Sequence, residues 1–113
     1  MKMLHNPRCG KSRDALKLLQ EKGQEPEIIE YLKNPPSAAQ LKKILKLLGK
    51  KPQDIIRKNE SLYKEQFKDK TYSDEQWIKI LAENPILIER PIVYTEKKAA
   101  LGRPPELVLG VLK

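Results

Sequence analysis

Residues that end helices and strands divide this chain into short segments. Its 113 residues include nine prolines, several of them next to asparagine or another proline. Pro7, Pro35 and Pro85 each follow an asparagine, and proline lacks an N–H and restricts the residue before it to extended conformations. A chain of this length fits one domain, residues 1–113, so we expect several short elements around a common core.

The spacing of apolar residues assigns these segments to strands and helices. Residues 2–5, 27–32 and 91–95 are typical of short buried strands, and 98–101 is expected to pair with 91–95. The expected helices comprise residues 10–22, 37–48, 52–56, 73–83 and 104–112. The expected order is a strand–helix–strand unit, then a helical block at about 37–84, then two strands and a final helix. This order is typical of the α/β class. A thioredoxin-like mixed sheet with an inserted helical subdomain has this order, although periodicity alone leaves other α/β arrangements open.

Two of the expected helices begin with a capping box, in which a serine and a glutamine three residues later satisfy each other's backbone N–H groups. Ser37 with Gln40 and Ser73 with Gln76 match this pattern. The inner face of the second of these helices is expected to consist of Trp77, Ile80 and Leu81. Residues 58–71 are polar and weakly patterned, and their expected anchors are Leu62, Tyr63 and Phe67.

Charge and cysteine content restrict the classes of function. The net charge of +8 favours the approach of small anions, but no DNA- or RNA-binding motif accompanies it, so we expect no nucleic-acid partner. No apolar run approaches the roughly 20 residues of a membrane span, so we expect no membrane span, and we expect no secretory signal at the start. A single cysteine excludes an intramolecular disulfide, which favours a reducing cytoplasm.

The segment HNPRCGKSR, residues 5–13, contains the only cysteine and the only histidine. Cys9 lies where the first strand meets the first helix, and free amide groups and nearby cations at such a junction lower a thiol pKa. The alternative is an inert, packed cysteine. We favour a reactive thiol, because the neighbours are polar and Gly10 permits close approach to the backbone.

Ser12 occupies the position of the second sulfur in a Cys-x-x-Cys motif. With no second cysteine, an adduct on Cys9 cannot be resolved internally, and an external thiol must complete any turnover. We expect a mainly structural role for Ser12. His5 either supports the thiolate or is a packed polar residue, and one histidine with one cysteine is too few ligands for a metal site.

Three arginines between apolar segments, Arg57, Arg90 and Arg103, differ from the lysines on the helix faces. A guanidinium in such a position needs an anionic partner and suits a tetrahedral oxyanion. Salt bridges with the nearby Glu60, Glu89 or Glu106 are the alternative, and the sequence leaves both interpretations open. Glu89 directly precedes Arg90 and is a candidate partner for its guanidinium.

Four segments together resemble the glutaredoxin-coupled arsenate reductases, a group that also includes Spx-like regulators. The segments are HNPRCGKSR, IIRKNE, NPILIERPIVY and GRPPELVL, in the same order, and the similarity extends over nearly the whole chain. The resemblance implies a thioredoxin-like fold with an inserted helical subdomain. It also implies a cytoplasmic thiol oxidoreductase that binds no cofactor and uses glutathione as its external reductant.

The resemblance further assigns roles to individual residues. Cys9 matches the nucleophile that attacks arsenate, after which glutathione and glutaredoxin resolve the adduct and arsenite is released. His5 matches the active-site histidine, and Gly10 and Ser12 belong to the same segment. Pro91 matches the position at which this fold places a cis-proline opposite the cysteine. The residues that match the family's anion-binding arginines are Arg57, Arg90 and Arg103.

Two other functions stay open at this point. One is an Spx-like regulator that binds RNA polymerase, although those regulators commonly carry a Cys-x-x-Cys switch that Ser12 removes. The other is a monothiol reductase of a different substrate. Lys11 stands where arsenate reductases of this type often have threonine, and it adds a cation beside Cys9.

Overall fold

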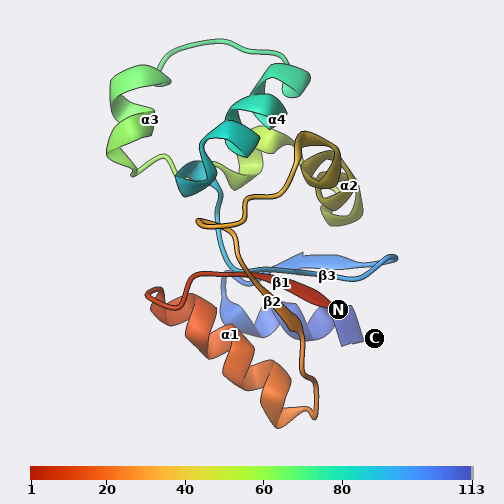
Figure 1. Cartoon of the computed structure of the whole chain (residues 1–113). Helices are drawn as coiled ribbons and strands as arrows, with labels where there is room; N and C mark the ends of the chain where they lie inside the picture. Colours follow the sequence, from red (N-terminus) through yellow and green to blue (C-terminus); the bar gives the residue numbers. More distant parts are fainter. Residues whose placement is uncertain (113) are drawn as a thin grey trace. The chain divides into compact units, whose positions relative to one another are not determined.

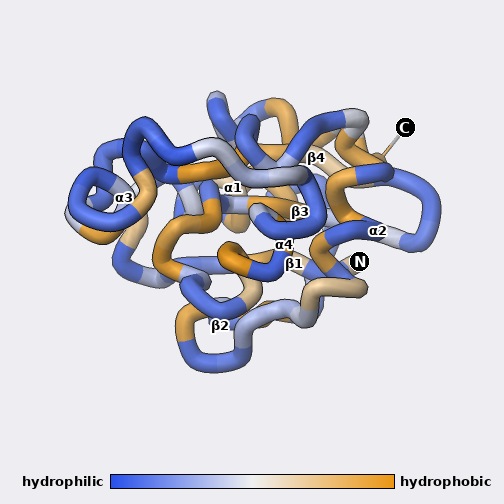
Figure 2. The backbone as a smooth tube through the Cα atoms, turned by 90° about the horizontal axis from the view of Figure 1, so that it is seen from above, coloured by the Kyte–Doolittle hydropathy of each residue, from blue (hydrophilic) through white to orange (hydrophobic). Residues whose placement is uncertain are grey.

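The computed structural model describes residues 1–112, which divide into two compact units (Figure 1). One unit combines Met1–Asn34 with Arg90–Lys113 and contains the sheet; the other is Pro35–Glu89 and is helical. The helical block that we expected at about 37–84 lies inside the second unit. In Figure 2, hydrophobic and hydrophilic residues alternate over short distances along the backbone. Within residues 1–112, no helix has the length and apolar character needed to cross a membrane.

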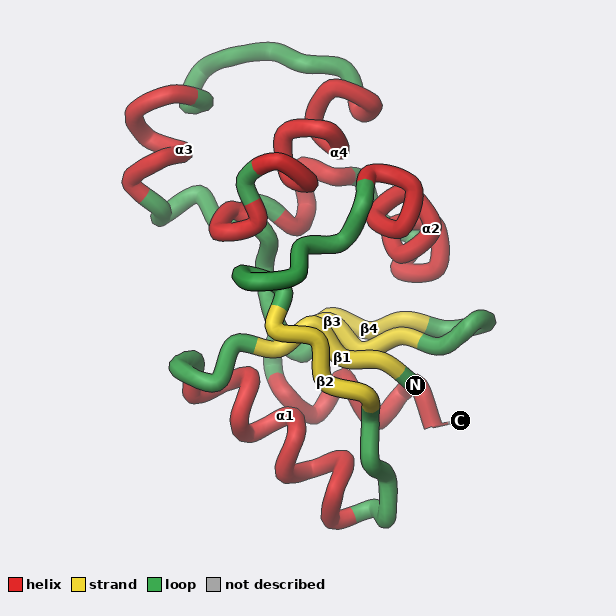
Figure 3. The backbone as a smooth tube through the Cα atoms, viewed as in Figure 1, coloured by secondary structure: helices red, strands yellow, loops and turns green. Residues whose placement is uncertain are grey.

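The sheet unit contains four strands in the order β2-β1-β3-β4 (Figure 3). Its strands are β1 (Lys2–His5), β2 (Glu27–Glu30), β3 (Ile92–Tyr94) and β4 (Ala99–Leu101). Strands β1 and β2 are parallel and are connected by α1 (Gly10–Glu21), whereas β3 is antiparallel to both β1 and β4. The mixed α/β sheet is therefore as predicted.

One face of the sheet packs against α1 and the final 3-10 helix η3 (Pro105–Leu112), which contact each other (Figure 1). Because side chains alternate along a strand, the paired residues Met3 and Val93 share this face. The core cluster is completed by Ala15, Leu19, Val108 and Val111. The last element was expected as an ordinary helix, and it has the tighter 3-10 geometry over most of the predicted range.

Gly102, between β4 and η3, lies against Pro91, the residue before β3. Its N–H donates to the Pro91 carbonyl over 2.8 Å. A Cβ at this position would lie 2.8 Å from Pro91 Cγ and 2.9 Å from Val108 Cγ1, closer than carbon atoms pack.

We therefore expect Gly102→Ala to lower the free energy of unfolding by about 1–3 kcal/mol, since neither the proline ring nor the buried valine has room to move. Urea unfolding followed by circular dichroism measures this change. Gly110→Ala is the matched control, because nothing lies within 4 Å of the position that its Cβ would take. Equal losses in the two variants would contradict the explanation.

The helical unit comprises α2 (Ala38–Leu48), α3 (Ser61–Gln66) and α4 (Asp74–Glu83), with 3-10 turns at Pro52–Ile55 and Pro85–Leu87. Both capping boxes are present, with Ser37 Oγ and Ser73 Oγ each accepting from the glutamine N–H three residues later at 3.2 Å. The residues of α2 and α4 that are buried are Leu41, Ile44, Leu45, Trp77, Ile78 and Leu81.

One expectation for the helical unit, on α4, needs correction. Residues 58–71, polar and weakly patterned in the sequence, contain α3, which has no buried residue. Phe67, expected as an anchor, does pack its ring 5.9 Å from that of Trp77. On α4, the inner face consists of Trp77, Ile78 and Leu81, whereas Ile80, which was expected there, is only partly buried.

Candidate active site

Cys9 lies at the junction between β1 and α1, as predicted, and its side chain is partly exposed. The Cys9 N–H donates to the Asn6 carbonyl over 3.0 Å, which closes the turn after β1. The Cys9 carbonyl accepts the N–H of Arg13 over 3.0 Å, which begins the helix. The sulfur is thus held at the N-terminus of a 12-residue helix, where unsatisfied N–H groups favour negative charge.

The pKa of the Cys9 thiol is lowered from its ordinary value. Burial alone raises the pKa, but this effect is outweighed by hydrogen bonding from the backbone N–H groups of Ser12 and Lys11, and by the charge and hydrogen bonding of the Arg90 guanidinium. A thiolate, not a thiol, is the nucleophilic form of cysteine. The site therefore favours the reactive form, which agrees with the prediction from the strand–helix junction.

Arg90 reaches Cys9 because of the antiparallel pairing of β1 with β3. Leu4 pairs with Ile92, so the end of β1, from which the Cys9 loop continues, lies beside the start of β3, which Arg90 and Pro91 precede. The Arg90–Pro91 peptide bond is cis, as predicted from the resemblance. Within the described residues, the Nε of Arg90 is buried and has no hydrogen-bond partner.

Arg103 also belongs to the sheet unit. Its Nη1 donates to the Arg90 carbonyl over 3.3 Å, and the peptide bond from Arg103 to Pro104 is a second cis bond. The side chain is half-buried. Two of the three predicted arginines are thus neighbours in this unit, and one of them acts directly on the Cys9 sulfur.

Arg57 lies in the helical unit and has anionic partners there. Its Nη1 is 2.6 Å from Glu60 Oε1, and its Nε is 3.7 Å from Glu89 Oε1. All three side chains are largely buried, with about a fifth of their surface exposed. For Arg57, the structure therefore shows the salt bridges that the sequence offered as one of two interpretations. One of its partners is Glu89, which was a candidate partner for Arg90. A role for Arg57 in anion binding stays a prediction.

His5 and Ser12 form a buried hydrogen-bonded pair, with His5 Nδ1 2.6 Å from Ser12 Oγ. Ser12 Oγ also accepts the Asn6 N–H over 3.1 Å. Burial lowers the pKa of His5, the Glu30 carboxylate partly offsets this, and Arg13 lowers the pKa further, so the imidazole is mostly neutral at pH 7. Ser12 therefore ties the end of β1 to the first turn of α1, which agrees with its expected structural role. No sequence signal indicated the pairing of His5 with Ser12, and a role for His5 in supporting the thiolate stays a prediction.

The described residues contain no group of three or more histidine, cysteine, aspartate or glutamate side chains that could hold a metal ion. At Cys9 the structure places a thiol of lowered pKa beside the Arg90 guanidinium. Such a pair can attack an electrophile that carries negative charge, because the cation offsets the charge on the incoming group.

We expect the alkylation of Cys9 to show this lowered pKa directly. The rate of reaction with iodoacetamide follows the thiolate fraction, so a lowered pKa moves the inflection of the rate–pH curve below the ordinary value of about 8.5. The same chain unfolded in guanidinium chloride is the control and should show an ordinary inflection. Coincident curves for the folded and unfolded chains would contradict the assignment.

Comparison with known proteins assigns the chain to a family. The ArsC family profile matches residues 4–111, so the chain belongs to the ArsC family. It is 47% identical over 114 aligned positions to YfgD of Escherichia coli (strain K12), which is named an uncharacterized protein, with 99% of this chain and 96% of that protein covered. It is 43% identical to an arsenate reductase of Neisseria meningitidis serogroup A, with 99% and 97% covered.

A solved structure of an arsenate reductase from Vibrio cholerae superimposes with a TM-score of 0.91 at 43% identity, covering 97% of this chain and 95% of that one. The predicted α/β class with a thioredoxin-like mixed sheet is thereby confirmed.

Proposed function

We propose that this protein is a cytoplasmic arsenate reductase that depends on glutathione and glutaredoxin. The observation that carries the proposal is the single cysteine, held at a helix N-terminus with the Arg90 guanidinium acting on its sulfur. Arsenate is a tetrahedral oxyanion, and a guanidinium offers it a planar set of donors. Relatives named arsenate reductases cover nearly the whole chain at 43% identity and support this choice of substrate.

In the proposed reaction, the Cys9 thiolate forms a sulfur–arsenic bond with arsenate, and one arsenic oxygen leaves as water after protonation. Arg90 offsets the negative charge on the arsenate oxygens during this attack. Arg103, which hydrogen-bonds the Arg90 backbone, and Arg57 are the further candidates for holding the oxyanion. Glutathione then displaces a second oxygen as water and forms a second sulfur–arsenic bond.

The remaining steps need a thiol from outside the chain, because Cys9 has no second cysteine to resolve the adduct. A glutaredoxin thiol attacks the glutathione sulfur and forms a disulfide with it. The electron pair of the broken glutathione–arsenic bond stays on arsenic, which reduces As(V) to As(III). Water then displaces Cys9 and releases arsenite, so that one arsenate and two thiols give arsenite, one disulfide and one water.

The test is arsenate-dependent oxidation of NADPH in an assay coupled through glutathione reductase. We expect activity that requires arsenate, glutathione and glutaredoxin, each omitted in turn as a control. Absence of oxidation at millimolar arsenate with several glutaredoxins would overturn the proposal. Oxidation that proceeds without arsenate, on another thiol adduct, would identify a monothiol reductase of a different substrate.

The Spx-like alternative has less support from the site. A regulator that switches by forming a disulfide needs a second thiol, and Ser12 at that position is buried and bonded to His5. Capture of the C-terminal domain of the polymerase α-subunit by both the wild type and Cys9→Ser would favour the regulator.

A further inference from the structure

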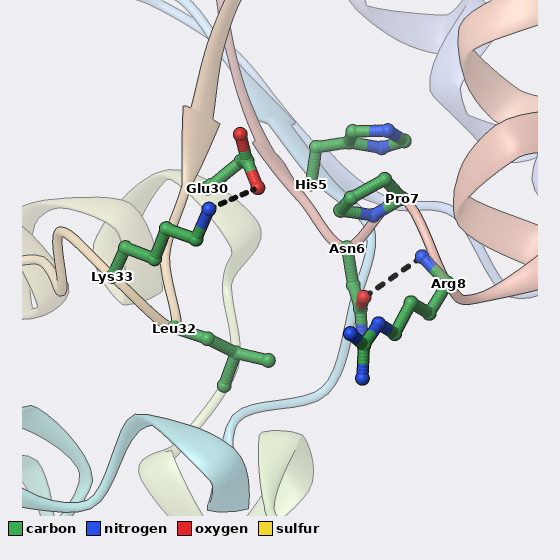
Figure 4. Close-up of a pocket in the computed structure, with 7 residues that line it drawn as sticks. All are labelled: His5, Asn6, Pro7, Arg8, Glu30, Leu32 and Lys33. Carbon is green, nitrogen blue, oxygen red and sulfur yellow. Dashed lines mark hydrogen bonds and ion pairs between the residues drawn. The ribbon is translucent and has the colours of Figure 1, made fainter.

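A cavity of about 350 Å³ lies beside the nucleophile loop (Figure 4). It is lined by the segment 5–8, which leads to Cys9, and by Glu30, Leu32 and Lys33 at the end of β2. Small-molecule sites in proteins measure about 300–1,000 Å³. This volume is at the lower end of that range, which suits a small peptide better than a folded partner.

The position of the cavity in the fold is one that favours ligand binding. His5 and Glu30 are a register pair at the carboxyl ends of the parallel strands β1 and β2, and both line the cavity. Ligands of open α/β sheets bind outside the carboxyl ends of parallel strands. Arg8, also in the lining, is adjacent to Cys9 in the chain, so a ligand in the cavity lies within a few ångströms of the nucleophile loop.

The charges of the lining are two cations and one carboxylate, Arg8, Lys33 and Glu30. Glutathione carries the complementary set of two carboxylates and one ammonium group. Lys33 Nζ lies 3.7 Å from Glu30 Oε1 with most of its side chain exposed, and exposed pairs of this kind are weak, so Lys33 can turn to a ligand. Leu32, which is 45% exposed, adds an apolar surface for the methylene groups of the peptide.

We propose that this cavity is the binding site for glutathione, with Arg8 and Lys33 holding its two carboxylates and Glu30 its ammonium group. The proposal rests on the proposed function for the identity of the ligand, since that reaction requires an external thiol. A peptide held here lies beside the loop that carries Cys9, and the peptide's own charges, rather than the thiol alone, determine which thiol is accepted.

The direct test is the binding of S-methylglutathione, which cannot react, to the wild-type protein, followed by ¹H–¹⁵N chemical shifts. We expect shifts at Asn6, Arg8 and Lys33, and binding about threefold to tenfold weaker in Arg8→Gln and in Lys33→Gln. Lys17→Gln is the matched control, since Lys17 is an exposed cation on α1. Shifts confined to other regions, or equal affinities in all four proteins, would overturn the proposal.

Steady-state kinetics test this binding site independently of the proposed arsenate reductase activity. In the coupled assay, Arg8→Gln and Lys33→Gln should raise the KM for glutathione by about threefold to tenfold and leave the KM for glutaredoxin unchanged. With mercaptoethanol, a neutral thiol, in place of glutathione, all variants should have equal rates.

Binding of S-methylglutathione without arsenate turnover would refute the reductase and keep the site. Turnover in which Arg8→Gln and Lys33→Gln leave the KM for glutathione unchanged would refute the site alone. A rise in the KM for glutaredoxin would assign the surface to the protein partner and overturn the peptide site.

Discussion

Replacing Cys9 with serine is expected to abolish arsenate reduction and to leave the fold unchanged. A serine hydroxyl stays protonated at neutral pH even where helix N–H groups and Arg90 act on it, so the nucleophile is lost and the rate should fall by about a thousandfold or more. The side chain is only partly buried, so the exchange of sulfur for oxygen leaves packing intact. The coupled assay with NADPH measures the loss.

Two controls make this result specific. Because Cys9 is the only cysteine, mass spectrometry after alkylation should show one added group on the wild type and none on Cys9→Ser. Thermal unfolding should give melting temperatures within a few degrees of each other, as expected for a surface substitution. Retention of a tenth or more of the wild-type rate by a verified serine variant would rule out Cys9 as the nucleophile.

Replacing Arg90 with methionine should have the second-largest effect. Methionine occupies a similar volume, but it removes both the charge and the hydrogen bond that lower the pKa of Cys9. The pKa should rise, so the alkylation inflection moves to higher pH and less thiolate exists at neutral pH. Loss of the guanidinium also removes stabilisation of the arsenate oxygens, and kcat/KM should fall by about 10²–10³-fold.

Arg13→Met is the matched control for this variant. Arg13 is a cation of the same segment, and its Nη1 donates to the Pro7 carbonyl over 3.0 Å. Its loss should leave the inflection of Cys9 alkylation close to that of the wild type. If Arg90→Met kept the wild-type inflection, or if Arg13→Met moved it equally, the pKa would be governed by the helix N-terminus and not by Arg90. Arg90→Lys should restore part of the effect, because it keeps the charge and loses the planar fork.

Local signals in the sequence predict most of the helices and strands and the lowered pKa of Cys9. Both kinds of feature depend mainly on residues that are neighbours in the chain. A capping box such as Ser37 with Gln40 acts within one turn of helix, and the helix start beside Cys9 lowers a thiol pKa wherever it occurs. α3 has no buried face, so hydrophobic spacing cannot reveal it.

Residue patterns do not predict contacts between segments that are distant in the chain. Arg90 reaches Cys9 through the register of β1 with β3, which no local motif states; only the family resemblance pointed to it. The pairing of His5 with Ser12, seven residues apart, depends on the turn between β1 and α1, and no motif states it either. The salt bridges of Arg57 with Glu60 and Glu89 are one of the two interpretations that the sequence leaves open. The spacing of apolar residues does not show whether an arginine binds a glutamate or an oxyanion, because both can accept hydrogen bonds from its guanidinium.

The sheet unit is discontinuous in the chain, since Met1–Asn34 is completed only by the segment that begins at Arg90. On the ribosome, Cys9 emerges before the helical unit Pro35–Glu89, whereas Arg90, β3 and β4 emerge after it. Domains form such non-local pairings late, because the intervening chain must be made and closed first. A nascent chain therefore carries the thiol without the arginine that lowers its pKa until the whole helical unit has been synthesised.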